Sequence, residues 1–182
     1  ASNLVPGDTN GTSDVFLRDS QLGTLQRVSL DNGQQLGSVS GEAKISRNGK
    51  VVAFTRGTGQ AAANESKATK PITGGQMCLR DLNGATLVCI SRSPVNGAPG
   101  NGDSGNSSLS GDGKVVAFES TATNLLTTAD GNGTVKDVFS FDAKTNTTTI
   151  LSTTDTGQPA NAASSAPAVS CAGNSGVFES LA

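Results

Sequence analysis

Two short blocks of sequence recur with a common period of about sixty residues, and this repeat constrains the fold more than any other feature. Ser46-Arg-Asn-Gly-Lys-Val-Val-Ala-Phe54 returns as Ser110-Gly-Asp-Gly-Lys-Val-Val-Ala-Phe118 and, in altered form, as Ser170-Cys-Ala-Gly-Asn-Ser-Gly-Val-Phe178. A second block keeps the same period: Asp14-Val-Phe-Leu-Arg-Asp19, Gln76-Met-Cys-Leu-Arg-Asp81 and Asp137-Val-Phe-Ser-Phe-Asp142. Ten residues beyond it come Val28-Ser29, Ile90-Ser91 and Leu151-Ser152. Such self-similarity indicates a repeat architecture.

Each repeat unit predicts four short strands. Asn48-Gly49 and Asp112-Gly113 are dipeptides favoured in type I′ turns, and each precedes a β-branched run that ends at a Phe. A second hairpin is expected to turn near Leu22-Gly23, Asn83-Gly84 and Thr145-Asn146. No segment has convincing helical periodicity, and Gly and Pro around residues 61–70 favour a loop there. The sequence therefore predicts an all-β fold, and tandem four-stranded units are typical of the antiparallel blades of a β-propeller.

The composition excludes several classes of site. The 182 residues include no His, Trp or Tyr, which excludes an imidazole base, a Ser-His-Asp triad and a Tyr or Trp stacking platform within this chain. The net charge of −2 gives no reason to expect nucleic acid as a partner. No apolar run approaches the roughly 18 residues of a membrane helix. Because the sequence begins without Met or a signal peptide, we expect a processed chain or a piece of a longer one.

The motifs of the third unit resemble a known family of repeats. Ser110-Gly-Asp-Gly-Lys-Val-Val-Ala-Phe-Glu-Ser120 is followed by Ala122-Thr-Asn-Leu125, an Asp-Gly-Asn-Gly loop, Asp137-Val-Phe139 and the closing hydrophobic-Ser pair. This order is similar to the TolB-type (PD40/WD40-like) β-propeller repeats of bacterial exported proteins, and the likeness covers essentially the whole chain. The resemblance implies a secreted or periplasmic propeller, commonly with six blades and often used for contacts with other proteins.

The strand order of that family implies about three blade equivalents. It assigns 14–29 to the outer half of one blade, 43–91 and 107–152 to two whole blades, and 167–180 to the inner half of another. Each half would leave an unpaired strand edge that has to be covered. A ring of three blades lies below the usual range of four to eight. We therefore expect pairing with another chain, as two copies in a six-bladed ring or as a filament, or with blades of the same gene product outside this sequence.

Three functions are compatible with this pattern. The first hypothesis is a non-enzymatic structural or protein-interaction module outside the cytoplasm, because the repeat accounts for nearly every apolar residue and leaves no convergent catalytic set. The second is the propeller portion of a larger hydrolase or lyase. The third is a glycan-binding lectin, which the lack of Trp and Tyr disfavours. An acid–base pair of Asp112 and Glu119 is disfavoured too, since Asp112 belongs to a turn and strand alternation directs Glu119 outward.

Two acidic loops are candidate calcium sites. Their oxygen-bearing residues are Asp8, Asn10, Thr12 and Asp14 in the first loop and Asp130, Asn132, Thr134 and Asp137 in the second. Alternating carboxylate and amide oxygens around a Gly can surround a hard cation. The alternative is an Asx-turn, in which these side chains bond their own backbone. Lys136 beside Asp137 weakens the second candidate, and segment 64–70, which replaces the loop in the middle unit, is not expected to bind an ion.

The three Cys and the repeated Phe complete the predictions. With Asn83-Gly84 as the turn, Cys78 faces Cys89 across two strands, which favours a disulfide over two buried thiols. Cys171 is left over as a free thiol or an intermolecular partner. Five Phe in register with the repeat are expected in the core: Phe16, Phe54, Phe118, Phe139 and Phe178. Phe141, which replaces an Arg of the other units, is predicted to be exposed as a contact surface.

Overall fold

The fold is all-β, as the sequence predicts, and the computed structural model describes residues 4–57, 74–84, 86–128 and 130–182. The strands are β1 (Phe16–Arg18), β2 (Leu25–Arg27), β3 (Leu30–Asp31), β4 (Gln34–Gln35), β5 (Ser40–Ile45), β6 (Val51–Arg56), β7 (Gln76–Asp81), β8 (Leu87–Cys89), β9 (Ser104–Leu109), β10 (Val115–Ser120), β11 (Asp137–Asp142), β12 (Thr147–Ile150), β13 (Ser164–Val169) and β14 (Gly176–Ser180). The segments 61–70 and 64–70 lie outside the described residues. Among the described residues, no helix has the length and apolar character needed to cross a membrane.

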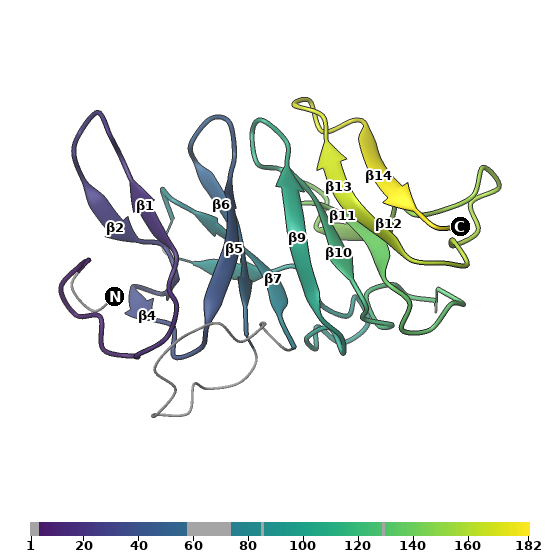
Figure 1. The fold of residues 1–182 in the computed structure, drawn as a ribbon, viewed down its shortest axis with the longest axis horizontal. Coiled ribbons are helices and arrows are strands. Elements are labelled where there is room, and N and C mark those ends of the chain that lie inside the picture. Colours follow the sequence, from purple (N-terminus) through teal and green to yellow (C-terminus); the bar gives the residue numbers. More distant parts are fainter. Residues whose placement is uncertain (1–3, 58–73, 85, 129) are drawn as a thin grey trace.

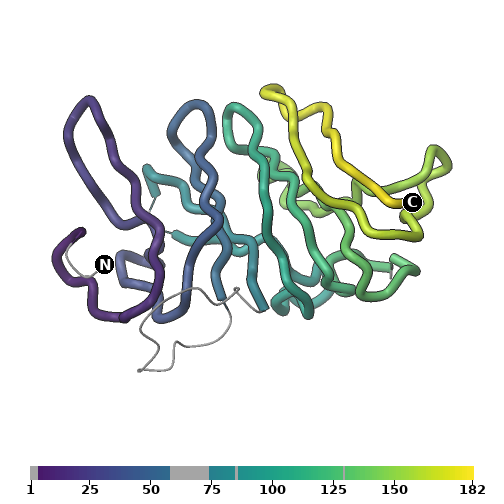
Figure 2. Tube along the Cα trace, viewed as in Figure 1, coloured from purple at the N-terminus to yellow at the C-terminus, as the bar shows by residue number. Residues whose placement is uncertain are grey.

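Two four-stranded antiparallel sheets form the centre, in the orders β5-β6-β7-β8 and β9-β10-β11-β12. Chain order equals spatial order within each sheet, as the repeat predicts. The pairs β1-β2 and β13-β14 are two-stranded sheets that correspond to the outer and inner halves of such a unit. Figure 1 shows the hairpins β1–β2, β5–β6, β9–β10 and β13–β14 side by side in chain order. The two termini therefore lie at opposite ends of the molecule (Figure 2).

A bulge at the same place in the first strand of each unit ties neighbouring units together. Glu42, Asn106 and Ala166 all have positive φ, between 44° and 52°, where the register with the next strand shifts. The freed backbone N–H of Asn106 donates to Glu42 Oε2 at 3.0 Å, and that of Ala166 donates to Glu119 Oε1 at 2.7 Å. A carboxylate of the preceding unit thus satisfies the N–H group that the bulges at Asn106 and Ala166 expose.

The turns of the inner hairpins differ from the predicted type I′. In the turn after β5, the N–H of Gly49 donates to the Ser46 carbonyl at 2.9 Å, and only Gly49 has a positive φ. The Asn48 side chain holds this turn, because its Oδ1 accepts hydrogen bonds from Ser46 Oγ and the Lys50 N–H. The altered copy of this block, after β13, forms the same turn, with Gly173 at φ 78°. The prediction of type I′ geometry at these turns is wrong.

The core has two clusters. One lies between the two four-stranded sheets, and the other, which contains Phe54, joins the first four-stranded sheet to the region around β1 and β2. Phe54, Phe118 and Phe139 are fully buried, as predicted, and Phe118 lies directly opposite Phe139 with ring centroids 5.9 Å apart. Phe16 and Phe178, on the two-stranded sheets, are only half-buried, because no further strand covers them. The expectation that all five Phe are core residues therefore holds only where a unit is complete.

Two residues expected at the surface are buried. Phe141 is 6% exposed and packs in the cluster that also contains Met77 and Leu79 of the neighbouring sheet. Glu119 is 7% exposed, although the alternation along β10 places it on the face opposite Phe118. The Glu119 prediction is wrong because a sheet between two neighbours is covered on both faces, so the face opposite Phe118 is buried too. The Phe141 prediction is wrong because this residue lies on the same face of β11 as Phe139 and packs against the neighbouring sheet.

Candidate functional site

A buried serine closes each repeat unit and holds the residue that begins its third strand. The hydroxyl of Ser29 donates to Asp14 Oδ1 at 2.6 Å, and that of Ser152 donates to Asp137 Oδ1 at 2.8 Å. Ser91 makes the same bond to Gln76 Oε1 at 3.1 Å. All three hydroxyls also accept the N–H of the following residue on the third strand. The last acidic residue of each predicted calcium loop, Asp14 or Asp137, therefore has a structural role. Gln76 fills the same role in the middle unit.

In the first acidic loop (residues 8–14), an arginine supplies the positive charge. Arg27 Nη2 lies 3.4 Å from Asp8 Oδ1, and Arg27 Nε lies 3.7 Å from Asp14 Oδ2. These three side chains are each at least nine-tenths buried. The guanidinium also lies over the ring of Phe16, 5.9 Å from its centroid. A buried cation thus already pairs with both carboxylates that were predicted to bind calcium.

The amides of the first acidic loop are oriented as donors toward its carboxylates. Asn10 Nδ2 donates to Asp14 Oδ2 and the Leu36 carbonyl, while its Oδ1 accepts the N–H of Thr12 at 3.0 Å, as in an Asx-turn. Gln35 Nε2 donates to Asp8 at 2.9 Å and to Asp14 at 3.2 Å. Because N–H groups and a guanidinium surround the carboxylates, this loop does not fit a calcium ion.

The second acidic loop (residues 130–137) has the same bond pattern around Asp137 without the arginine. Asn132 Nδ2 donates to Asp137 Oδ2 at 2.9 Å and to the Ala160 carbonyl at 2.7 Å. Asp137 is fully buried and Asp130 is 7% exposed. Burial raises the pKa of Asp137, and the charge of Asp130 raises it further, against the lowering effect of hydrogen bonds from Asn132 and Ser152. Two buried carboxyl groups therefore lie close together in this loop.

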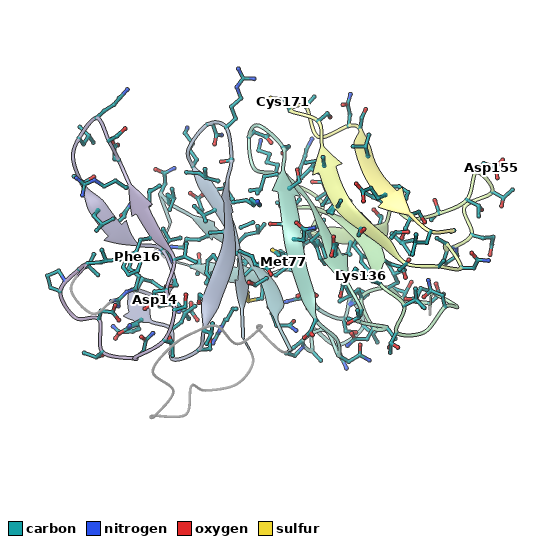
Figure 3. All side chains as sticks on the ribbon, viewed as in Figure 1. Asp14, Phe16, Met77, Lys136, Asp155 and Cys171 are labelled. Atoms are coloured by element: carbon teal, nitrogen blue, oxygen red, sulfur yellow. A yellow bond between two sulfur atoms is a disulfide. The ribbon has the colours of Figure 1, made fainter. Side chains whose placement is uncertain are left out.

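The remaining predicted ligands lie at the margins of the loops. Thr12 Oγ1 reaches the Ser38 carbonyl at 3.5 Å, and Thr134 is exposed. Across the described ranges, no group of three or more His, Cys, Asp or Glu side chains converges in the manner of a metal centre. Asp14 and Lys136, which mark the two loops, lie in opposite halves of the molecule (Figure 3). The loops are separate sites.

A second polar cluster surrounds Glu119. Lys136 Nζ lies 2.9 Å from its Oε2, and the Asn106 Nδ2 and the Ala166 N–H donate to its Oε1. Burial acts to raise the pKa of Glu119, but these three hydrogen bonds and the charge of Lys136 outweigh it, so the pKa lies below its ordinary value. Lys136 therefore pairs with Glu119 rather than with its neighbour Asp137. The cluster joins three strands and has the character of a structural ion pair.

Asp112, the other member of the imagined acid–base pair, has a turn role, as predicted. It is exposed, and hydrogen bonds from the Lys114 N–H and the Ser110 hydroxyl lower its pKa. It lies in the turn that precedes β10, whereas Glu119 lies near the far end of that strand.

Cys78 lies directly opposite Cys89, in the register that the sequence predicts, and the two are joined in a disulfide between β7 and β8. Cys171 is free and exposed in the turn after β13. Disulfides persist mainly in oxidising compartments, so the bridge weakly favours a location outside the cytoplasm. Two grooves of about 700 Å³ each also lie between the four-stranded sheets, and both are lined by Val88, Phe141 and Asn146.

Comparison with solved structures identifies the architecture. The chain superposes on a crystal structure of the tricorn protease with a TM-score of 0.60 at 15% identity, over 94% of this chain and 13% of that one. It matches a chain from a structural and mechanistic analysis of two prolyl endopeptidases with a TM-score of 0.53 at 16% identity, over 92% and 22%. The chain is a partial β-propeller. Its two four-stranded sheets correspond to blades, and the pairs β1-β2 and β13-β14 correspond to half-blades.

The matched chains are all longer than this one. TolB from Acinetobacter baumannii matches with a TM-score of 0.46 at 16% identity, over 93% of this chain and 35% of that one. The segment thus spans between about an eighth and about a third of the three matched chains. No family model matches the sequence, and no curated protein matches it.

The sequence analysis missed the residues that distinguish the two acidic loops. Arg27 and Gln35 lie outside the Asp/Asn motif, on β2 and β4, and reach it only through the fold. One signal was available: Arg27 directly precedes the repeated Val28-Ser29 pair, at the position that Ile150 occupies before Leu151-Ser152. Extending the alignment of the units by one residue before the hydrophobic-Ser pair would have shown a charged residue, Arg27, in the first unit alone.

Proposed function

We propose that this propeller segment is a non-enzymatic structural or protein-interaction module of the cell envelope or the extracellular space, and that it binds other protein chains through the edges of its half-blades. The observation that carries the proposal is the open edge of β14. In both complete blades the equivalent strands, β6 and β10, pair on both sides, whereas β14 pairs only with β13 among the described strands. An open strand edge is a template for pairing with another chain.

The side chains of β14 support this role. Val177 is 69% exposed, whereas Ala117 at the equivalent position of β10 is fully buried. Phe178 is half-buried, whereas its equivalent Phe118 is fully buried beneath β11. Apolar side chains at an unpaired edge make association favourable, because pairing removes their surface from water.

A second copy of this chain offers the complementary strand. β1 belongs to the same strand type as β7 and β11, and it pairs only with β2 among the described strands. Its Phe16 is half-buried, whereas the equivalent Phe139 is buried against Phe118. The register of the complete blades would place Phe178 of one copy opposite Phe16 of another, and Val177 opposite Leu17. This pairing would complete a four-stranded blade from two half-blades.

Light scattering with edge variants tests the proposal. The 18.1 kDa chain is expected to associate at micromolar concentration, and Val177→Lys is expected to abolish association by placing a charge on the edge. Val95→Lys is the matched control, because Val95 is 74% exposed but lies in a loop. In a Cys171→Ser background, Leu17→Cys with Val177→Cys should give a disulfide between copies. A monodisperse 18.1 kDa species whose β1 and β14 amides are nevertheless protected from exchange would contradict it.

A second candidate is the propeller portion of a larger hydrolase or lyase. It is supported by the names of two matched chains, a protease and a prolyl endopeptidase, of which this segment spans 13% and 22%. The intact mass of the protein isolated from its source distinguishes the candidates. A species far larger than 18.1 kDa with peptidase activity would favour the second, and a species of that mass would favour the first.

A further inference from the structure

The three repeat units place one buried polar position in three different electrostatic environments. The position is Asp14 in the first unit, Gln76 in the middle unit and Asp137 in the third. On the last strand, the serine that bonds this position is preceded two residues earlier by Arg27, Cys89 or Ile150. The register pairs these three residues with Phe16, Cys78 and Phe139, which lie two residues beyond the polar position. The acid of the first unit thus has an arginine, the neutral Gln of the middle unit needs none, and the acid of the third unit has an isoleucine.

Gln35, which donates to the carboxylates of the first acidic loop alongside Arg27, is replaced in the third unit as well. The Leu36 N–H donates to the Ser29 carbonyl, and the Ala160 N–H donates to the Ser152 carbonyl. This shared bond aligns Gln35, which precedes Leu36, with Pro159, which precedes Ala160. Both groups that donate to the carboxylates of the first loop from outside it are therefore apolar in the third unit.

The carboxylates of the second acidic loop have no positive partner within the described part of the chain. Asp130 is more than nine-tenths buried and forms no hydrogen bond or ion pair with any described residue. Asp137 is fully buried and accepts hydrogen bonds only from Asn132 and Ser152. The nearest cation in sequence, Lys136, contacts Glu119. Two buried carboxylates without a countercharge are costly, because burial removes them from water.

A buried oxygen without a partner lies in the same loop. Asn132 Oδ1 is fully buried and accepts no hydrogen bond, whereas Oδ1 of the equivalent Asn10 accepts the Thr12 N–H. The Nδ2 of the same Asn132 side chain contacts Asp137, so this oxygen lies near that carboxylate, on the amide branch directed away from it. The two carboxylates have no described countercharge, and the amide oxygen has no described hydrogen-bond donor. A cation would interact favourably with all three.

We propose that the second acidic loop binds Ca²⁺ through side-chain oxygens of Asp130, Asn132 and Asp137, and that Arg27 takes the place of this ion in the first loop. Ca²⁺ accepts six to eight oxygen ligands in variable geometry, so backbone carbonyls and water can complete the shell. Mg²⁺ is disfavoured because it demands near-ideal octahedral geometry and gives up its water reluctantly. The site contains no sulfur or imidazole, which disfavours zinc.

Calcium titration of the EGTA-treated chain tests the proposal. Calorimetry should report one site per chain, and Tm should rise by roughly 5–10 °C at about 100 times the Kd. Asp130→Asn should abolish both signals. Asp8→Asn, the equivalent change in the first loop, is the matched control and should leave the calcium response unchanged. Mg²⁺ at the same concentration should give a smaller shift.

A charge substitution keeps the test informative if Asp130→Asn fails to fold. Ile150→Arg places a guanidinium at the position equivalent to Arg27, and it should raise Tm in EGTA while removing the response to Ca²⁺. The proposal would be overturned if the unmodified chain showed neither binding heat nor a Tm shift. It would also be overturned if the response survived Asp130→Asn, or if Asp8→Asn removed it instead.

Discussion

The hairpin β9–β10 of the complete blade and the half-blade β13–β14 occupy equivalent places in the repeat, but in different surroundings. Phe118 and Ala117 are fully buried, whereas the equivalent Phe178 is half-buried and Val177 is 69% exposed. Glu119 is bonded by Lys136, Asn106 and Ala166, whereas the equivalent Glu179 is exposed. The difference shows that burial in this fold is set by the next strand and the next blade, rather than by the residue's own strand.

The space around the turns of the inner hairpins also depends on the neighbouring blade. A Cβ added to Gly113 would lie 2.6 Å from Val51 Cβ of the preceding blade, and one added to Gly173 would lie 2.8 Å from Val115 Cγ2. A Cβ on the equivalent Gly49 would meet nothing within 4 Å. The turns at Gly113 and Gly173 therefore pack against the preceding inner hairpin, whereas no preceding inner hairpin among the described residues lies against the turn at Gly49.

The largest expected difference between the complete and the half-blade is in the Phe position. Phe118→Ala should lower the free energy of unfolding by about 3–5 kcal/mol, because it removes a fully buried ring. Phe178→Ala should cost only about 1–2 kcal/mol, because its ring is already partly in water. Urea unfolding measures both, at a dilution where light scattering reports the single chain. Self-association at higher concentration should bring the two losses of unfolding free energy closer together, because pairing buries Phe178. Equal losses for the two variants in the single chain would contradict the comparison.

The turn glycines should give the next largest difference. Gly49→Ala places a side chain at φ 70° in open space and should cost about 1–2 kcal/mol. Gly113→Ala adds to the same backbone strain a clash with Val51, which raises the expected cost to about 2–4 kcal/mol. Thermal unfolding of the two variants under identical conditions gives the comparison. A Gly49→Ala variant that is the less stable of the two would show that the first inner turn is also covered.

The smallest expected difference is in the two glutamates and depends on pH. Because the folded state lowers the pKa of Glu119, its contribution to stability is present above the unfolded-state pKa and is lost as the pH falls through the folded-state pKa. Glu119→Gln should cost about 1–2 kcal/mol at pH 7 and much less at pH 3. The measurement is the urea midpoint at both pH values.

Glu179→Gln is the control for this pH effect, because its side chain is exposed. It should leave the midpoint unchanged at pH 7 and pH 3. A Glu119→Gln variant whose stability falls as steeply with acid as that of the unmodified chain would assign the pH dependence to other groups.

A turn with the backbone angles of type I′ occurs in this fold, but at a different Asn-Gly pair from those predicted. The sequence predicted type I′ turns at Asn48-Gly49 and Asp112-Gly113, where only the Gly has a positive φ. The one two-residue hairpin with positive φ at both central residues is at Asn32-Gly33, between β3 and β4, among the described residues. An Asn-Gly pair is compatible with both turn types, and the hydrogen bonds of Ser46 Oγ select the longer turn after β5.

Part of the candidate site could likewise be predicted from the sequence, and part could not. The Asp and Asn positions of both acidic loops were apparent from spacing alone, and the structure brings Asp14 and Asp137 to equivalent places. The choice between an Asx-turn and an ion site was not apparent, because it depends on Arg27 and Ile150. These residues reach the loops through strand pairing between segments more than ten residues apart.

The sequence alone determined the repeat, the four-stranded unit, the strand order within it and the opposition of Cys78 and Cys89. These features follow from period-two alternation, turn residues and spacing, which are properties of neighbouring residues in one chain segment. Only the tertiary structure decided that Glu119 and Phe141 are buried, and that Arg27 pairs with the carboxylates of one acidic loop while no described cation pairs with those of the other. The physical reason is that alternation separates the two faces of a strand, whereas the stacking of blades decides which faces lose their water.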